Sequence, residues 1–197
     1  HLLRAWRFWL LAGLLGALVS SAAYGLFPPP YRARAVVNVD FNLEQAWPQE
    51  TDRQQFYYLE RETRKLEEIA WSDVVMQAVA QADGRISVEQ LRGGVLTLSQ
   101  PAEAGWHFYA QDEDPARARI LASTWARAFV RAARTDLAAQ SGMSSFVRMR
   151  VTQADVVPDG RSLSSAAYLL AGVLLGWLVG ALLFLFFNRA RILIEAV

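Results

Sequence analysis

Two long uncharged stretches, residues 8–27 and 162–188, lie near the two ends of the chain. A bilayer core is crossed by about 20 mostly apolar helical residues, and a charge at its centre costs at least about 2.5 kcal/mol. Uncharged runs of this length are therefore typical of transmembrane helices. We expect two membrane spans, with residues 28–161 forming one domain between them and both chain ends on the same side.

The charges beside these stretches predict the orientation. Arg4 and Arg7 precede the first stretch, and Arg189 and Arg191 follow the second. Basic residues next to a span favour the cytoplasmic side, so we expect residues 1–7 and 189–197 to be short cytoplasmic segments and residues 28–161 to be extracytoplasmic. The first stretch is longer than the 7–15 apolar residues of a signal peptide, which favours a retained anchor.

Composition narrows the possible functions of the central domain. The 20 basic and 19 acidic residues nearly balance, and all but five of them lie within residues 28–161. A near-neutral domain of this size suits one compact core and carries no strongly basic patch, so we do not expect nucleic-acid binding. The absence of cysteine from the sequence removes disulfides, thiol catalysis and cysteine metal sites.

Hydrophobic periodicity predicts the elements of this domain. Alternation predicts strands, and spacings of three and four residues predict helices. Asp114 and Pro115 form a helix start, and Ser87 with Gln90 has the spacing of a capping box. The expected order is a strand at 33–41, helices at 53–70 and 74–83, strands at 94–99 and 106–111, a helix at 114–140 and a strand at 146–156.

This β-α-β-β-α-β order predicts an α+β domain of the ferredoxin-like type, with helices on one face of a sheet. The two long helices each have an apolar face that we expect to be buried. In residues 53–70 this face comprises Phe56, Leu59, Thr63, Leu66 and Ala70, and in residues 114–140 it comprises Ala118, Ala122, Trp125, Phe129 and Ala133.

Three local stretches resemble the Wzz-type chain-length determinant proteins, which are polysaccharide co-polymerases of bacterial envelopes. Pro30–Ala35 is similar to the family's Pro-Tyr-x-Ala approach to the first strand. Asp114–Ala122 resembles its Asp-Pro start of a long alanine-rich helix, and residues 154–158 resemble its approach to the second span. The order of elements between two spans is similar as well, so the resemblance covers nearly the whole chain.

The resemblance implies a non-enzymatic protein of the bacterial inner membrane with a periplasmic domain. It implies a homo-oligomeric ring that works beside a polysaccharide polymerase, in contact with membrane lipid and a lipid-linked glycan, and sets polymer length. Many members carry a tall helical hairpin, which residues 28–161 are too short to form, so we expect a squat domain. We expect no kinase domain after Val197, and near the second span only Pro158 matches the family's several prolines.

Glycines mark one face of the second uncharged stretch. Gly172, Gly176 and Gly180 are four residues apart, and small residues at this spacing let helix backbones approach closely. Glycine is common in membrane helices, but three in register favour helix packing, against the other span or a neighbouring subunit. Gly13 and Gly16 are candidates for the opposing surface.

Arginines mark one face of the helix at 114–140. Arg117, Arg127, Arg131 and Arg134 could contact an acidic glycan, a neighbouring subunit or lipid headgroups, because guanidinium groups bind carboxylate and phosphate bidentately. The alternative is an ordinary solvated helix face.

The remaining polar residues do not predict an active site. The acidic run at 112–114 is explained by helix capping, and His107 has no second histidine or cysteine with which to share a metal, so we expect it to be packed. We find no phosphate loop or nucleophile motif, and predict neither an enzyme nor a cofactor. An extracytoplasmic sensor or binding module, or an accessory subunit of another membrane complex, remains an alternative.

Overall fold

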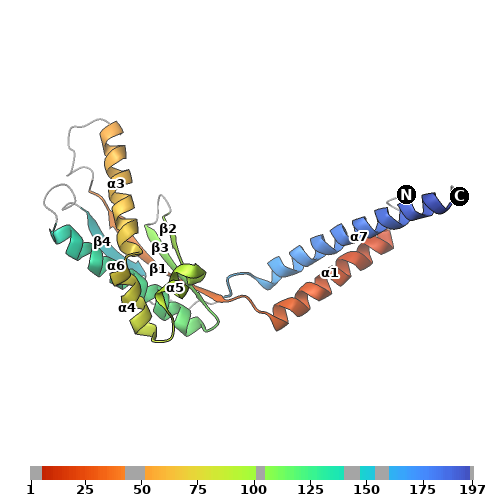
Figure 1. The fold of residues 1–197 in the computed structure, drawn as a ribbon, viewed down its shortest axis with the longest axis horizontal. Helices are drawn as coiled ribbons and strands as arrows, with labels where there is room; N and C mark the ends of the chain where they lie inside the picture. Colours follow the sequence, from red (N-terminus) through yellow and green to blue (C-terminus); the bar gives the residue numbers. More distant parts are fainter. Residues whose placement is uncertain (1–5, 43–51, 101–104, 140–146, 154–159, 196–197) are drawn as a thin grey trace. The chain divides into compact units, whose positions relative to one another are not determined.

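The structure is a computed structural model that describes residues 6–42, 52–100, 105–139, 147–153 and 160–195. It divides into two compact units (Figure 1). The first, the terminal helix pair, comprises His1–Pro29 and Gly160–Val197 and contains α1 (Trp6–Leu26) and α7 (Ser165–Glu195). Both helices are long and apolar enough to cross a membrane. The predicted stretch at 154–158 lies outside the described residues.

Residues 30–159 form the second unit, the central domain. Its four strands form an antiparallel sheet in the order β2-β3-β1-β4. The prediction of a mixed helix and sheet domain between two apolar helices is confirmed. The elements in chain order are β1 (Tyr31–Asp40), α3 (Asp52–Ala70), α4 (Asp73–Asp83), α5 (Val88–Gln90), η2 (Leu91–Val95), β2 (Leu96–Ser99), β3 (Trp106–Asp112), α6 (Pro115–Ala139) and β4 (Arg148–Gln153).

Local signals explain where several helices begin and end. Ala116 N–H donates to Asp114 Oδ1 at 2.9 Å, so Asp114 caps α6 as predicted. The capping box at α5 is also confirmed, with reciprocal bonds between Ser87 and Gln90. Helix α4 ends at Gly84, whose φ of 70° suits glycine and whose N–H donates to Ala80 O.

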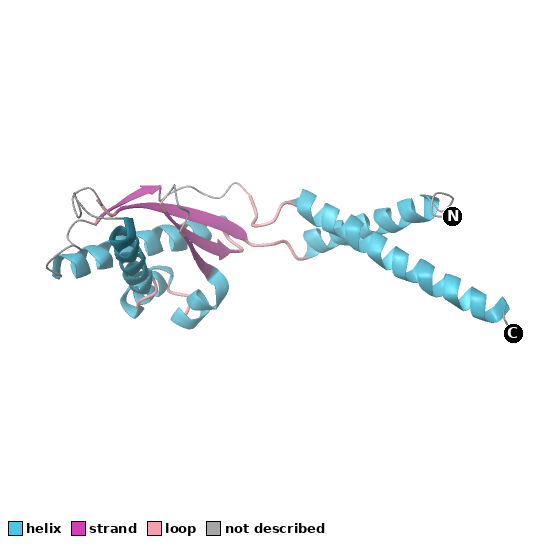
Figure 2. Cartoon of the chain, turned by 90° about the horizontal axis from the view of Figure 1, so that it is seen from above, coloured by secondary structure: helices cyan, strands magenta, loops and turns pink. Residues whose placement is uncertain are grey.

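All the described helices of the central domain lie on one face of the sheet (Figure 2). Along β1 the inward residues Ala33, Ala35 and Val37 are fully buried, and the small alanines leave room for the large side chains of α6. Trp125 and Phe129 of this helix pack against Phe108 of β3, with ring centroids 4.8 and 5.1 Å apart. Period-two burial therefore fixes which face of the sheet meets the helices.

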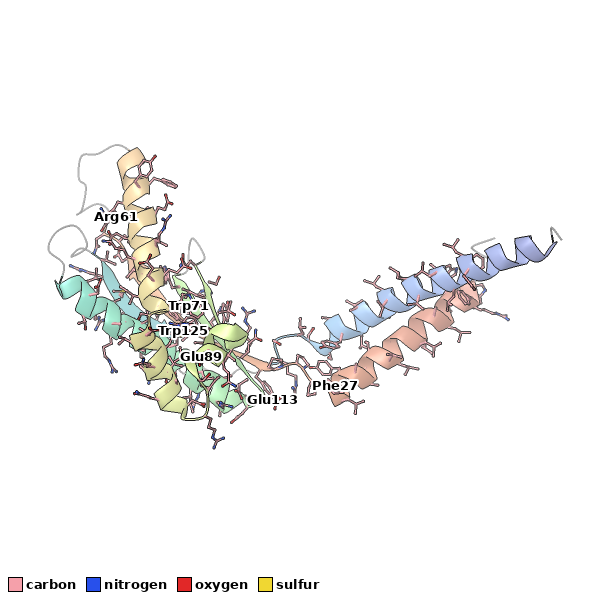
Figure 3. All side chains as sticks on the ribbon, viewed as in Figure 1. Phe27, Arg61, Trp71, Glu89, Glu113 and Trp125 are labelled. Carbon is pink, nitrogen blue, oxygen red and sulfur yellow. The ribbon has the colours of Figure 1, made fainter. Side chains whose placement is uncertain are left out.

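Trp125 also joins α6 to the end of α3. Its indole Nε1 donates to Ala70 O at 2.8 Å, and its ring lies 4.8 Å from that of Trp71 (Figure 3). The hydrogen bond satisfies a polar group that would otherwise be buried without a partner.

The expected buried face of α3 is wrong over the first half of the helix. Phe56 is 63% exposed, and Leu59 and Thr63 are only partly buried. The buried row is instead Tyr58, Glu62, Leu66 and Ala70, at a spacing of four residues. Glu62 is tolerated there because its carboxylate pairs with Arg61 and Lys65. The expected and observed stripes thus share Leu66 and Ala70 and differ in the first half of the helix, where the row of Phe56, Leu59 and Thr63 is the more exposed one.

Candidate functional site

The glycines singled out in the sequence lie where α1 and α7 pack on each other. Gly16 meets the backbone of Gly172 and Gly176, and a Cβ at Gly16 would collide with the carbonyl oxygen of Gly172. Gly180 lies against Ala12. Because no side chain fits between the backbones at Gly16, Gly172 and Gly176, these three glycines permit a contact that larger residues would prevent. Gly13 is placed differently and packs under the indole of Trp177.

Three hydrogen bonds tie the two segments of this unit together. Ser20 Oγ donates to Tyr168 O at 2.7 Å, and Trp177 Nε1 donates to Trp9 O at 3.0 Å. Beyond the helices, Arg161 Nη1 donates to Pro29 O at 2.8 Å. Interhelical hydrogen bonds in apolar surroundings contribute roughly 1 kcal/mol each and fix the register of the helices.

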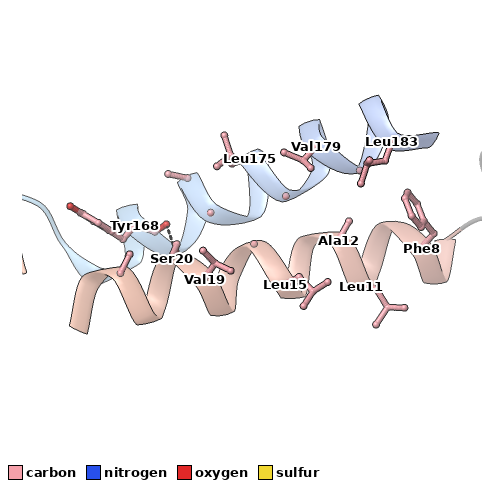
Figure 4. Close-up of a pocket in the computed structure, with 16 residues that line it drawn as sticks. Phe8, Leu11, Ala12, Leu15, Val19, Ser20, Tyr168, Leu175, Val179 and Leu183 are labelled. Carbon is pink, nitrogen blue, oxygen red and sulfur yellow. Dashed lines mark hydrogen bonds between the residues drawn. The ribbon is translucent and has the colours of Figure 1, made fainter. Parts of the chain in front are cut away.

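A groove runs along one side of the helix pair (Figure 4). Its volume is about 770 Å³, and its lining includes Leu15 and Val19 of α1 and Leu175 and Val179 of α7. Ser20 and Tyr168 are the polar residues of the lining. Such a groove accepts apolar groups, such as a lipid chain or the side chains of another helix.

The structure separates Arg117 from the other three arginines of the predicted stripe. Its guanidinium pairs bidentately with Asp83 of α4, at 2.6 and 2.7 Å, and reaches Asp112 at 3.3 Å. The hydrogen bonds from Arg117 hold the pKa of the Asp83 carboxyl below its usual range. Arg117 therefore links α6 to α4 and is engaged within the domain.

Arg127, Arg131 and Arg134 stay together on α6. They line a hollow of about 510 Å³ that extends to Val151 of β4. Within it, Arg134 Nη2 donates to Met149 O at 2.9 Å, which holds this side chain along the edge strand. The structure thus brings three of the four predicted arginines to one surface, beside the edge of the sheet.

The acidic run and His107 have structural partners. Asp112 Oδ1 accepts from Asp114 N at 2.9 Å, and Asp112 also pairs with Arg117. His107 Nδ1 lies 3.2 Å from Tyr109 Oη, half-buried on the sheet face that the helices leave uncovered. Within the described part of the chain, no three histidine or carboxylate side chains are grouped as metal ligands would be.

A further group of arginines was missed by the sequence analysis. Arg32 and Arg34 of β1 and Arg148 and Arg150 of β4 are exposed at alternate positions of two strands that pair with each other. We call the outward residues of the sheet the open face. Arginine at every second position of a strand indicates that the arginines of each strand share one face. The sequence does not indicate that β1 and β4 are neighbours in the sheet, which the strand order shows.

Comparison of the sequence with models of known protein families gives no match, and comparison with curated proteins also gives none.

Proposed function

We propose that this chain is a non-enzymatic protein of the bacterial inner membrane that regulates the chain length of a surface polysaccharide. In this proposal α1 and α7 are membrane spans, both termini are cytoplasmic, and the central domain is periplasmic. Several copies form a ring beside a polysaccharide polymerase. The subunits hold or measure the growing polymer by their geometry, so no residue performs chemistry.

One observation supports the proposal most: in chain order, a single α/β domain lies between two apolar helices that pack on each other. Two of the motifs that resemble co-polymerases begin elements of this domain. Pro30–Ala35 leads into and forms the start of β1, and Asp114–Ala122 caps and begins α6. We also propose that the domain is ferredoxin-like. The antiparallel sheet order β2-β3-β1-β4 with helices on one face supports this.

The outward apolar stripe of α3 supports self-association. Phe56 and Tyr57 are 63% and 58% exposed, and Phe56, Leu59 and Thr63 line a hollow of about 380 Å³ on the helix surface. Large aromatic side chains are enriched at protein interfaces and cost free energy when left in water. We propose that this stripe contacts a second copy in the ring.

Deletion of the gene in its source bacterium tests the function. We expect the surface polysaccharide to lose its preferred length and to show a broad distribution on gels, with the total amount of polymer little changed. Reintroduction of the wild-type gene should restore the preferred length. An unchanged length distribution after deletion would contradict the proposal and would favour a sensor or an accessory subunit.

A further inference from the structure

Arginines on the two sides of the central domain have different surroundings. On the helical side, Arg61, Arg64, Arg92 and Arg117 each pair with a carboxylate. On the open face, Arg34, Arg148 and Arg150 have no ion pair with any described residue. Among the described residues, these four helical-side arginines are therefore neutralised by nearby carboxylates, whereas the three strand arginines are not.

The sheet register places these arginines on one surface. Burial of Ala33, Ala35 and Val37 on β1 and of Met149 on β4 forces the intervening residues outward, because side chains alternate along a strand. In the register of β1 and β4, Asn38 lies opposite Arg150 and Asp40 lies opposite Arg148. The outward positions of the four described strands carry one acidic residue, Asp40. They carry four arginines, at positions 32, 34, 148 and 150, so positive charge is in excess.

Aromatic and hydroxyl groups continue the open face beyond β1. Tyr109 of β3 lies opposite Arg34, and the guanidinium of Arg32 stacks 3.9 Å from the centre of the Tyr109 ring. Tyr109 also contacts His107, and Thr97 of β2 is its neighbour on the next strand. The Arg32 guanidinium therefore covers one face of the Tyr109 ring, and His107 and Thr97 are neighbours of this ring on the same surface.

This combination suits an acidic sugar polymer. Guanidinium groups bind carboxylates bidentately, aromatic rings pack against the C–H groups of sugar rings, and hydroxyl groups bond to sugar hydroxyls. An extended sheet surface also offers similar contacts along its length, as a repeating polymer requires. The excess of positive charge on the outward side of the strands favours a negatively charged ligand.

We propose that the open face of the sheet, centred on Arg32, Arg34, Tyr109 and Arg150, binds a carboxylate-bearing polysaccharide. This inference rests on the proposed function, which brings a growing polysaccharide close to the domain. It moves the expected glycan contact away from the helix α6 arginines, of which Arg117 and Arg134 are engaged within the chain.

Binding of fluorescent polygalacturonate to the full chain in phosphatidylcholine nanodiscs tests the proposal. The open-face variant carries Arg32→Gln, Arg34→Gln and Arg150→Gln, and the control carries Arg64→Gln, Arg85→Gln and Arg119→Gln outside the strands. Both variants lose the same charge. We expect the dissociation constant to rise at least about tenfold in the open-face variant and less than about twofold in the control. Equal losses in both variants would overturn the proposal, because net charge alone would then explain binding.

Chemically matched probes separate a sugar site from a general anion site. Methyl-esterified polygalacturonate has the same backbone without the charge, and we expect it to bind at least about tenfold more weakly. Polyglutamate and single-stranded DNA should also bind more weakly than polygalacturonate. Equal or tighter binding of either polyanion would contradict a polysaccharide site, and equal binding of the ester would exclude recognition of the carboxylates.

The mass of each nanodisc sample separates this proposal from the proposed function. Glycan binding by a wild-type chain that is monomeric would preserve the open-face site and contradict the ring. A ring that binds no polygalacturonate would contradict the site alone. The open-face substitutions could also dissociate an oligomer without changing the thermal unfolding temperature. The open face would then be a contact between subunits, which would overturn the glycan site.

Discussion

The terminal helix pair and the central domain reach close packing by opposite means. Helices α1 and α7 meet through Gly16, Gly172 and Gly176, where backbone touches backbone. The central domain instead fills its interior with large rings such as Phe108 and Trp125. This difference fits the proposal that α1 and α7 span a membrane. Apolar side chains gain little by leaving lipid, so close backbone approach stabilises a contact there, whereas in water the burial of large apolar side chains does so. The two regions should therefore respond to opposite kinds of substitution.

Removing a large ring should affect the central domain most. Phe108→Ala deletes a fully buried side chain between α6 and the sheet, and we expect the free energy of unfolding of the domain to fall by about 3–5 kcal/mol. Urea unfolding followed by tryptophan fluorescence measures this. Phe56→Ala, at an exposed aromatic residue, is the control and should change stability by less than about 1 kcal/mol. Equal effects of the two substitutions would contradict the core described for α6 and the sheet.

Adding a side chain should affect the helix pair most. The sequence contains no cysteine, so Ala12→Cys with Gly180→Cys provides one cross-link between the facing helices. We expect oxidation to join these cysteines within one chain, and Gly16→Leu to reduce the cross-linked fraction at least about fivefold, since the new side chain meets the Gly172 backbone.

A matched control lies on the same helix. Gly25 has open space where its side chain would be, so Gly25→Leu should leave the cross-linked fraction unchanged. Cross-linking that survives Gly16→Leu, or that fails equally in both variants, would show that the glycine contact does not hold the pair together.

The pair formed by Asp83 and Arg117 should have a smaller effect that depends on pH. Asp83→Asn removes the charge from an almost fully buried carboxylate, and we expect a loss of about 2 kcal/mol at pH 7. Because Arg117 lowers the pKa of folded Asp83 below its ordinary value, this contribution is complete above that ordinary value. It is lost as the pH falls through the lowered pKa of the folded state.

Urea unfolding of wild type and Asp83→Asn between pH 7 and pH 2.5 measures this pH dependence. The difference between the two proteins should be largest near pH 7 and should shrink below about pH 4. Glu68→Gln, which removes an exposed carboxylate of α3, is the control. A difference that is constant over the whole range would show that the stabilisation does not come from the ionised carboxylate.

The sequence predicted features that depend on neighbouring residues and missed those that depend on distant ones. The Asp114 cap, the Ser87 capping box and the spacing of Gly172, Gly176 and Gly180 are readable within one helical turn or one helix face. The pairing of Arg117 with Asp83 joins residues 34 positions apart, and no local pattern specifies it. The open face depends on the order of strands, which brings Arg150 beside Asn38.

Helix α3 shows why periodicity alone can select the wrong face. Phe56, Leu59 and Thr63 have the spacing of a buried stripe, yet the row containing Tyr58 and Glu62 is the buried one. The pattern of apolar residues cannot show this, because a buried glutamate depends on partners, here Arg61 and Lys65, that neutralise its charge. The exposed aromatic side chains of Phe56 and Tyr57 are the basis of the proposed self-association.

The mass of the full chain in nanodiscs, measured by native mass spectrometry, tests the central claim of self-association most directly. We predict a closed homo-oligomer of several subunits, which Phe56→Glu with Tyr57→Glu should dissociate. The control Val74→Glu with Ile120→Glu adds the same charge at exposed apolar residues outside the hollow and should leave the oligomer intact. A wild-type monomer, or a fixed complex with a different protein, would contradict the ring and with it the proposed role in setting polymer length.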